Sequence, residues 1–345
     1  MCKFKSAIIL KDRVYIPDCD SHQDMLEQLG IADTRENATK LFVRAELFPK
    51  DGDPFSDISK WCFNVDQDIL PDWFVEKYDR ERMVKAVKGW AKDRLHDRVD
   101  GLEIDSGAGH IIKDCKNVKV CGSASISKVY GSASISYVCG SASISYVYGS
   151  ASISKVCESA SISKVCESAS ISEVCGSASI SYVYGSASIS YVYGSASISE
   201  VCGSASISEV YGSASISKVC ESASISEVCG SASISEVYGS ASISEVCGSA
   251  SISYVYGSAS ISEVYGSASI SEVCDSASIS EVYGSASISK VCGSASISEV
   301  CGSASISGSQ YGWNKGNLVL SENATFKDRC NKIIYQSGDW KFVNI

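Results

Sequence analysis

The sequence predicts a mainly β protein, a β-solenoid of nonapeptide repeats between an α+β N-terminal capping domain and a β-rich C-terminal cap. Three observations support this fold class. Residues 122–301 are twenty successive copies of one nine-residue unit, and a short fixed period is typical of a solenoid. Each copy contains Ser-Ala-Ser-Ile-Ser, whose apolar and hydroxyl side chains alternate as they do in a strand. Each copy also keeps Ala, Ile and Val in register, which a flexible linker does not need.

Residues 1–110 have an ordinary composition and are expected to form the α+β capping domain. Apolar runs bounded by turn residues predict strands, and apolar residues at spacings of three and four predict helices. The expected elements are two strands within 6–16, a helix over 22–31, a strand over 40–47 and a longer helix over 79–99. The long helix has one apolar stripe, formed by Met83, Ala86, Val87, Trp90, Ala91 and Leu95. This stripe can pack on the domain's own sheet or on the first coil of the solenoid.

Residues 111–307 are assigned to the solenoid. Because nine is an odd number, a continuous strand would turn successive isoleucines to opposite faces, so the chain must turn once per copy. Two copies per coil, stacked at about 4.8 Å with Ala, Ile and Val inside, are preferred over three. Glycine usually begins each copy, but Glu158, Glu167, Glu221 and Asp275 replace it in four copies. This replacement suggests that a positive φ is not obligatory there.

Residues 308–345 break the rhythm and are expected to form the C-terminal cap. Strands are expected over 317–321, 324–327, 332–336 and 340–343. Solenoids require atypical end units, and Trp313 and Trp340 are large apolar side chains of a kind that the repeats never use. We expect these two tryptophans to close the last coil.

The charge and hydropathy of the chain restrict the partners it can bind and the location we expect for it. It carries 30 Lys and Arg against 40 Asp and Glu, a net charge of −10, and the rod is expected to be acidic along its length. An acidic surface disfavours direct binding to nucleic acid or to an anionic membrane. No apolar run is long enough for a transmembrane helix or a signal-peptide core, so a cytoplasmic location is expected. The 17 cysteines are then expected to be free thiols.

The chain is not expected to be an enzyme, because the repeats lack most residues that enzymes use for proton transfer. His22, His96 and His110 are far apart in sequence and suggest no catalytic set. The run 18–22 lacks a zinc spacing, and 51–53 and 66–68 lack the distal ligands of a calcium loop. No cofactor and no metal are therefore expected, although an activity of the N-terminal domain is left open.

Two rows of side chains are the candidate interaction sites. The ninth position of each copy is Tyr or Cys, which would stack into ladders. Packing is the simplest explanation, and a metal-binding or self-association stripe is the alternative. Free exchange of Tyr and Cys argues against metal, because a ligand site cannot replace a thiolate by a phenol. The seventh position is Glu, Lys or Tyr and is expected to face solvent. The candidate tyrosine ladder is Tyr130, Tyr148, Tyr184, Tyr193, Tyr211, Tyr238, Tyr256, Tyr265 and Tyr283. The candidate acidic row is Glu173, Glu200, Glu209, Glu227, Glu236, Glu245, Glu263, Glu272, Glu281 and Glu299.

Several solenoid families share features with these residues. The calcium-binding β-roll also repeats every nine residues, but each of its copies requires Gly-Gly and Asp, which are missing here. The serine face beside a tyrosine ladder resembles ice-binding solenoids, and the acidic rod resembles pentapeptide-repeat solenoids that imitate DNA. The whole chain, including residues 63–73 and 338–341, looks like repetitive proteins encoded by gut bacteria and their phages. That last resemblance implies no assigned activity.

The resulting functional prediction is a non-enzymatic structural or interaction protein. It would present a flat serine face and Tyr/Cys ladders on a rigid acidic rod, with a protein partner or a second copy of itself as ligand. Two alternatives remain at this point: an acidic DNA mimic that inhibits a host enzyme, and a solenoid that orders water or ice.

Overall fold

The computed structural model describes residues 4–308, 319–328 and 333–336. The chain divides into two compact units. The N-terminal unit comprises residues 1–99 and 107–112, and the solenoid unit comprises residues 100–106 and 113–345.

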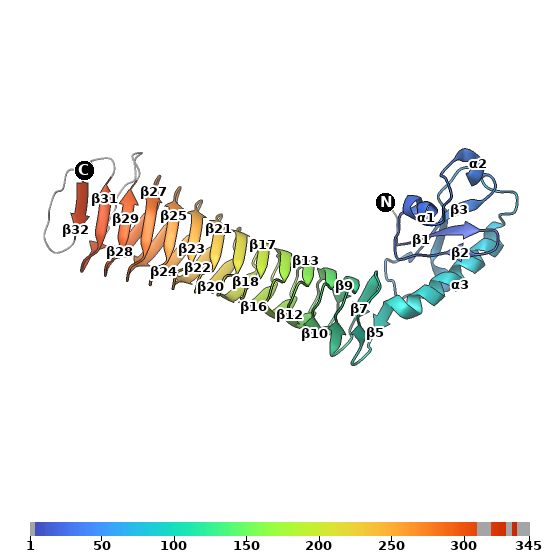
Figure 1. Cartoon of the computed structure of the whole chain (residues 1–345), viewed down its shortest axis with the longest axis horizontal. Coiled ribbons are helices and arrows are strands. Elements are labelled where there is room, and N and C mark those ends of the chain that lie inside the picture. Colours follow the sequence, from blue (N-terminus) through green and yellow to red (C-terminus); the bar gives the residue numbers. More distant parts are fainter. Residues whose placement is uncertain (1–3, 309–318, 329–332, 337–345) are drawn as a thin grey trace. The chain divides into compact units, whose positions relative to one another are not determined.

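The N-terminal unit contains a four-stranded antiparallel sheet with the strand order β2-β1-β3-β4 (Figure 1). The strands are β1 (Lys5–Leu10), β2 (Val14–Tyr15), β3 (Phe42–Phe48) and β4 (Cys62–Val65). The strands expected within 6–16 and over 40–47 are confirmed, whereas β4 was not predicted.

Helices pack against this sheet: α1 (His22–Gln28), α2 (Arg35–Ala38), the 3-10 helix η1 (Ile58–Lys60) and α3 (Glu76–Arg94). Met83, Val84 and Val87 of α3 are buried in one core cluster with β-strand residues such as Ile9 and Val43. The apolar stripe of the long helix therefore packs on the domain's own sheet. The helix ends earlier than the expected residue 99, because residues 95–97 form the strand β5 (Leu95–Asp97).

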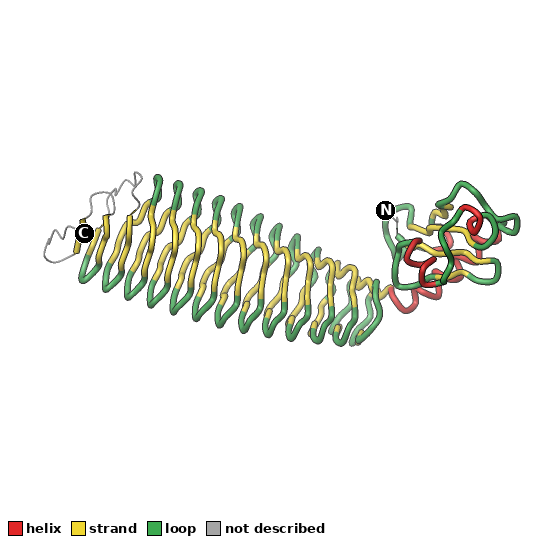
Figure 2. The backbone as a smooth tube through the Cα atoms, turned by 45° about the horizontal axis from the view of Figure 1, so that its top comes forward, coloured by secondary structure: helices red, strands yellow, loops and turns green. Residues whose placement is uncertain are grey.

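The solenoid has two repeats per coil, so the preference for two copies over three is confirmed. Each repeat contributes one strand, and each strand pairs in parallel with the strand 18 residues further along, as Ile135 does with Ile153. Successive strands alternate between a 13-stranded and a 15-stranded sheet (Figure 2). Neighbouring coils are 4.7–4.8 Å apart between the Cα atoms of Cys121 and Cys139 and of Cys274 and Cys292.

The strands before the repeats are β6 (Glu103–Ile104), β7 (His110–Lys113) and β8 (Val118–Val120). The repeat strands are β9 (Ser125–Tyr130), β10 (Ser134–Val138), β11 (Ser143–Val147), β12 (Ser152–Val156), β13 (Ser161–Val165), β14 (Ser170–Val174), β15 (Ser179–Val183), β16 (Ser188–Val192), β17 (Ser197–Val201), β18 (Ser206–Val210), β19 (Ser215–Val219), β20 (Ser224–Val228), β21 (Ser233–Val237), β22 (Ser242–Val246), β23 (Ser251–Val255), β24 (Ser260–Val264), β25 (Ser269–Val273), β26 (Ser278–Val282), β27 (Ser287–Val291) and β28 (Ser296–Val300).

The interior of each coil is formed by the third, fifth and eighth residues of the repeat. Ala205, Ile207 and Val210 illustrate the pattern, with at most 1% of each residue exposed. Because the strands stack in register, every alanine, isoleucine and valine lies on its counterpart in the next coil. This arrangement buries the alanine, isoleucine and valine side chains of the repeats, as the sequence predicts.

The first residue of every repeat has a positive φ, including the four copies that lack glycine. Glu158, Glu167, Glu221 and Asp275 have φ values of 56–60°. The expectation that positive φ is not obligatory there is therefore wrong. In each case the carboxylate accepts a hydrogen bond from the backbone N–H of the glycine one coil earlier, as Glu167 does from Gly149 at 2.8 Å. This bond offsets the cost of a left-handed backbone in a residue with a Cβ atom.

The C-terminal end continues both sheets and then reverses direction. β29 (Ser305–Gly308), β30 (Val319–Leu320) and β31 (Thr325–Asp328) pair in parallel with the coil before them, whereas β32 (Ile333–Gln336) is antiparallel to β31. Phe326 is opposite Ile306 and is 2% exposed. The β-rich cap is thus confirmed where it is described. Trp313, Trp340 and the strand expected over 340–343 lie outside the described residues.

Candidate functional site in the solenoid ladders

The 13-stranded sheet presents an unbroken row of carboxylates at the seventh position. We call this row the glutamate ladder; it consists of Glu209, Glu227, Glu245, Glu263, Glu281 and Glu299. Each member is the cross-strand partner of the next. Six like charges thus follow one another at the coil spacing on one face of the solenoid, which costs electrostatic free energy unless a cation or partner compensates them.

The 15-stranded sheet presents a different row at its seventh positions. We call its first part the Lys–Tyr strip; it consists of Lys128, Tyr146, Lys164 and Tyr182, stacked in that order. Tyr146 and Tyr182 are 40% and 43% exposed. The ammonium group of Lys164 lies 5.3 Å from the centre of the Tyr146 ring. The strip is therefore a cationic and aromatic surface without a carboxylate of its own row.

Charge is distributed unevenly along the repeats. Residues 122–193 contain three lysines and three glutamates, whereas residues 194–307 contain eleven carboxylates and two lysines. The expectation of a rod that is acidic along its whole length is therefore wrong. The net negative charge of the repeats belongs to their second part.

The tyrosines of the ninth position stack on one another in four pairs. These pairs are Tyr130–Tyr148, Tyr193–Tyr211, Tyr238–Tyr256 and Tyr265–Tyr283, with ring centres 5.0–5.2 Å apart. Several hydroxyls donate to a glutamate of the preceding coil, as Tyr193 does to Glu173 and Tyr265 to Glu245, both at 2.7 Å. These hydrogen bonds, together with burial, raise the pKa of Tyr193 and Tyr265 to about 12.

The same contacts fix several members of the candidate acidic row. Glu236 and Glu263 accept from Tyr256 and Tyr283 at 3.0 and 2.7 Å. Glu173 also pairs with Lys155 at 2.9 Å, which together with the Tyr193 hydroxyl lowers its pKa. These internal bonds favour a packing role for the ninth-position tyrosines, and two of the carboxylates that accept them, Glu245 and Glu263, belong to the glutamate ladder.

The cysteines of the ninth position also stack on one another. Cys121, Cys139, Cys157 and Cys175 follow one another at intervals of 18 residues and form one column, and Cys202–Cys220, Cys229–Cys247 and Cys274–Cys292 are separate pairs at the same interval. Three stacked pairs are disulfides, Cys121–Cys139, Cys229–Cys247 and Cys274–Cys292. The expectation of free thiols is wrong for these six residues, because in-register stacking brings their Cα atoms within the range that a disulfide spans. Nine other cysteines among the described residues are free thiols.

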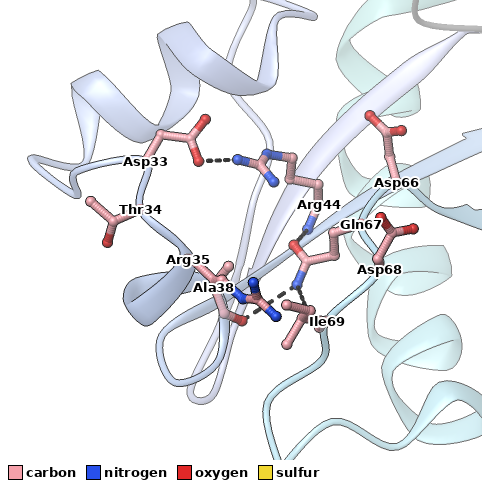
Figure 3. A pocket seen from close by; sticks show the side chains of 9 residues that line it. All are labelled: Asp33, Thr34, Arg35, Ala38, Arg44, Asp66, Gln67, Asp68 and Ile69. Carbon is pink, nitrogen blue, oxygen red and sulfur yellow. Dashed lines mark hydrogen bonds and ion pairs between the residues drawn. The ribbon is translucent and has the colours of Figure 1, made fainter.

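The N-terminal unit contains a polar pocket of about 350 Å³ between α2, β3 and the loop after β4 (Figure 3). Arg44 forms an ion pair with Asp33, and its backbone N–H donates to the Gln67 side chain at 2.9 Å. Gln67 in turn donates to the carbonyl of Ile69 at 2.7 Å. The residues that line the pocket include no Ser, Cys or His that could act as a nucleophile. The amide of Gln67 fastens the loop to the sheet, which is a structural role.

Two of the histidines that are far apart in sequence, His96 and His110, form a pair in the structure. His96 and His110 stack, with Nε2 of His96 3.1 Å from Nδ1 of His110. Burial, followed by the neighbouring His110 and Arg94, lowers the pKa of His96 to about 4. His96 is therefore neutral at physiological pH and is poorly suited to donate a proton there.

The residues of the run 18–22 separate into different contacts. Asp18 pairs with Arg94, Asp20 with Lys5, and His22 with Asp66. The fold therefore directs their side chains to different partners and does not assemble them into one cluster.

Comparisons with known proteins give no match: no family model fits the chain, and neither a curated protein nor a solved structure is significantly similar to it. Within the described ranges, no helix has both the length and the apolar character needed to span a bilayer.

Proposed function

We propose that this protein is a non-enzymatic interaction rod that associates with further copies of itself. The contact joins the Lys–Tyr strip of one copy to the glutamate ladder of another. The observation that carries the proposal is the presence of two flat, oppositely charged rows on the two sheets of the same solenoid.

The spacing of the two rows supports a second copy as the partner. Both rows repeat at the coil spacing of 4.7–4.8 Å, because both follow the same stacked coils. A lysine that meets one carboxylate therefore brings the following positions of the strip opposite further carboxylates. Exposed ion pairs contribute only up to about 1 kcal/mol each, so the association should be weak and sensitive to salt. Burial of the exposed rings of Tyr146 and Tyr182 adds an apolar contribution.

The two rows lie on different sheets, so the contact is heterologous. A heterologous contact does not close on itself unless a rotation closes a ring, and it otherwise produces open assemblies. The expected species are therefore side-by-side assemblies that grow with concentration, and they should not stop at a dimer.

The linear charge density of the ladder does not favour the alternative of a DNA mimic. Double-stranded DNA carries one negative charge per about 1.7 Å of its axis. The glutamate ladder carries one charge per coil, that is, one per 4.7–4.8 Å. Its density is thus about one third of that of DNA, and we retain self-association as the function to be tested.

The test is size-exclusion chromatography with light scattering over a range of protein concentrations. We expect the mass to rise with concentration at low salt and to fall toward the monomer at about 1 M salt, where screening extends over only about 3 Å. The double variant K128Q/K164Q removes both charges of the strip and should lower the mass at every concentration. The matched control K218Q/K290Q neutralises two lysines of the same sheet outside the strip and should leave the mass unchanged. A strict monomer at all concentrations, or an equal effect of both variants, would overturn the proposal.

A further inference from the structure

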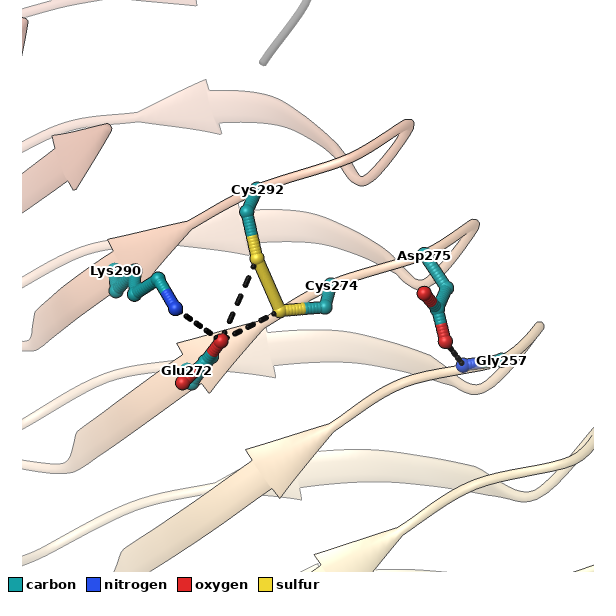
Figure 4. Close-up of a disulfide and its surroundings, with 6 residues drawn as sticks. All are labelled: Gly257, Glu272, Cys274, Asp275, Lys290 and Cys292. Atoms are coloured by element: carbon teal, nitrogen blue, oxygen red, sulfur yellow. Dashed lines mark hydrogen bonds and ion pairs between the residues drawn. A yellow bond between two sulfur atoms is a disulfide. The ribbon is translucent and has the colours of Figure 1, made fainter. Parts of the chain in front are cut away.

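The solenoid holds three clusters with the same composition and the same spacing. Each consists of a seventh-position glutamate, the cysteine two residues later and the cysteine one coil further on. The three Glu–Cys–Cys clusters are Glu200/Cys202/Cys220, Glu227/Cys229/Cys247 and Glu272/Cys274/Cys292. In each cluster the two sulfur atoms and one carboxylate oxygen all lie within 4.8 Å of one another. Figure 4 shows the third cluster, with the Glu272 carboxylate beside both sulfurs.

In each cluster, the distance from the glutamate oxygen to the sulfur of the cysteine one coil further on, 3.5–3.7 Å, agrees with the geometry of a tetrahedral metal ion. Zinc binds thiolate sulfur at about 2.3 Å and carboxylate oxygen at about 2.0–2.2 Å, so the ligand atoms of one tetrahedron lie about 3.5–3.8 Å apart. The carboxylate oxygen of Glu200 is 3.7 Å from the sulfur of Cys220. The oxygen of Glu272 is 3.5 Å from the sulfur of Cys292. The oxygens of Glu227 and Glu272 lie 2.8 and 3.0 Å from the sulfurs of Cys229 and Cys274, so in these two clusters the oxygen and the first sulfur must move apart to surround such an ion.

The first cluster is the one whose cysteines are free thiols. Cys229–Cys247 and Cys274–Cys292 are disulfides, which offer no thiolate to a metal until they are reduced. Burial, followed by the neighbouring Cys220 and Glu200, raises the pKa of Cys202 to about 12, and burial also raises the pKa of Cys220. Both thiols are thus protonated near neutral pH, and an ion that binds them must displace their protons.

The remaining stacked cysteines, the column Cys121, Cys139, Cys157 and Cys175, have different neighbours. The coils of Cys121 and Cys139 carry Lys119 and Tyr137 at the corresponding positions. Beside Cys157 and Cys175, Glu173 is held by Lys155 and by the hydroxyl of Tyr193, whereas Glu272 of the third cluster pairs with Lys290 and still lies beside both of its sulfurs. The cysteines of the column supply an internal comparison, because they stack in the same way outside the three Glu–Cys–Cys clusters.

We propose that Glu200, Cys202 and Cys220 form a binding site for a thiophilic divalent cation of the zinc class. The two sulfurs and one carboxylate oxygen are its protein ligands, and water takes the fourth position. The other two Glu–Cys–Cys clusters become equivalent sites when their disulfides are reduced. A bound ion links two successive coils at the edge of the solenoid, in the place that a disulfide occupies in the oxidised clusters.

The experiment uses the intact chain, reduced with a phosphine and freed of metal with a chelator that is then removed. Cd²⁺ is added stepwise, and thiolate-to-metal charge-transfer absorption in the ultraviolet counts the occupied sites. The fully reduced protein should bind three ions per chain. At neutral pH each ion should release about two protons into weakly buffered solution, because a metal binds thiolate and an ordinary thiol is protonated there.

Three variants assign the ligands. C202S should remove one equivalent of the absorption, and E200Q should weaken one of the three sites at least tenfold without removing its thiolates. C166S is the matched control, because Cys166 is a buried ninth-position cysteine whose stacking neighbours are tyrosines. It should bind all three ions. Circular dichroism of each variant checks that the solenoid is intact.

Three outcomes would overturn the proposal. The first is absence of charge-transfer absorption in the reduced protein. The second is an equal loss in C202S and C166S. The third is a stoichiometry of five ions that E200Q does not affect, because all stacked cysteine pairs would then bind without a carboxylate.

Discussion

The acidic residues that replace glycine at the first repeat position provide a sharp test of the backbone geometry. Glu167 has a φ of 58°, and its carboxylate accepts the Gly149 N–H at 2.8 Å. A left-handed backbone costs a non-glycine residue about 1–2 kcal/mol. The hydrogen bond to an exposed carboxylate returns about 1 kcal/mol. Removal of the carboxylate should therefore lower the stability of the folded protein, and removal of the Cβ atom should raise it.

The variants E167G and E167A separate these two effects. E167G loses the hydrogen bond but relieves the strain, so its free energy of unfolding should stay within about 0.5 kcal/mol of the parent. E167A loses the bond and keeps the strain, so it should be less stable than E167G by about 1–2 kcal/mol. In the interior of a helix or strand, a glycine variant is ordinarily less stable than an alanine variant by about 0.5–1 kcal/mol. At this turn we expect the opposite order, with E167G more stable than E167A.

The assay is urea denaturation followed by circular dichroism, with hydrogen exchange of peptides around Gly149 and Glu167 as a local measure. E167Q is the control, because it keeps an acceptor oxygen and the strain and removes only the charge. It should lie between the parent and E167A. If E167A proved as stable as E167G or more stable, the argument from positive φ would be refuted.

Two further predictions concern the core and the histidine pair. Replacing Ile207, which is 1% exposed, with alanine should destabilise the solenoid by about 2–5 kcal/mol in urea denaturation, whereas S208A on the exposed face should change stability by less than about 0.5 kcal/mol; equal effects would contradict the assigned interior. Because the pKa of His96 is lowered to about 4 in the folded protein, the unfolded chain takes up a proton at a higher pH than the folded chain does. The N-terminal unit should therefore be most stable above pH 6.5, and its free energy of unfolding should decrease as the pH falls toward 4. After a discount for the partial exposure of the ring, the free energy of unfolding should decrease by about 1–2 kcal/mol over this pH range. If the melting temperature of H96N fell by the same amount over the same pH range, His96 would not be the cause.

The coil could be predicted from the repeat because two simple constraints act on it. An odd period requires one turn per copy, and the apolar third, fifth and eighth positions must share one interior. These constraints allowed two or three copies per coil, and two were preferred. The same period identified the seventh position as the outward row that carries Glu, Lys or Tyr.

The pairing at the ninth position becomes visible only when the sequence is compared at the 18-residue interval of the coil. Along the chain, Tyr and Cys exchange irregularly at this position, which argued against a metal site. Read at intervals of 18 residues, Cys202 lies on Cys220 and Tyr193 on Tyr211. The glutamate ladder likewise becomes visible only at this interval, because Glu209 and Glu227 are neighbours only when alternate copies share a sheet.

Other features depended on tertiary contacts that no local pattern reveals. His96 and His110 are 14 residues apart and meet only in the folded unit. The positive φ at Glu158 was missed because the residue type was taken as evidence of an ordinary backbone. Its carboxylate reaches the Gly140 N–H in the preceding coil at 2.8 Å, and that contact makes the unusual conformation acceptable.

The most direct test of self-association is cross-linking between differently labelled copies. Equal amounts of ¹⁴N and ¹⁵N protein are mixed at low salt and treated with a carbodiimide, which joins a lysine to a carboxylate in direct contact. We expect mixed-isotope products that link Lys128 or Lys164 to the glutamate ladder, and we expect high salt to suppress them. Products confined to single copies, or mixed products that involve Lys218 and Lys290 equally, would contradict the proposed contact.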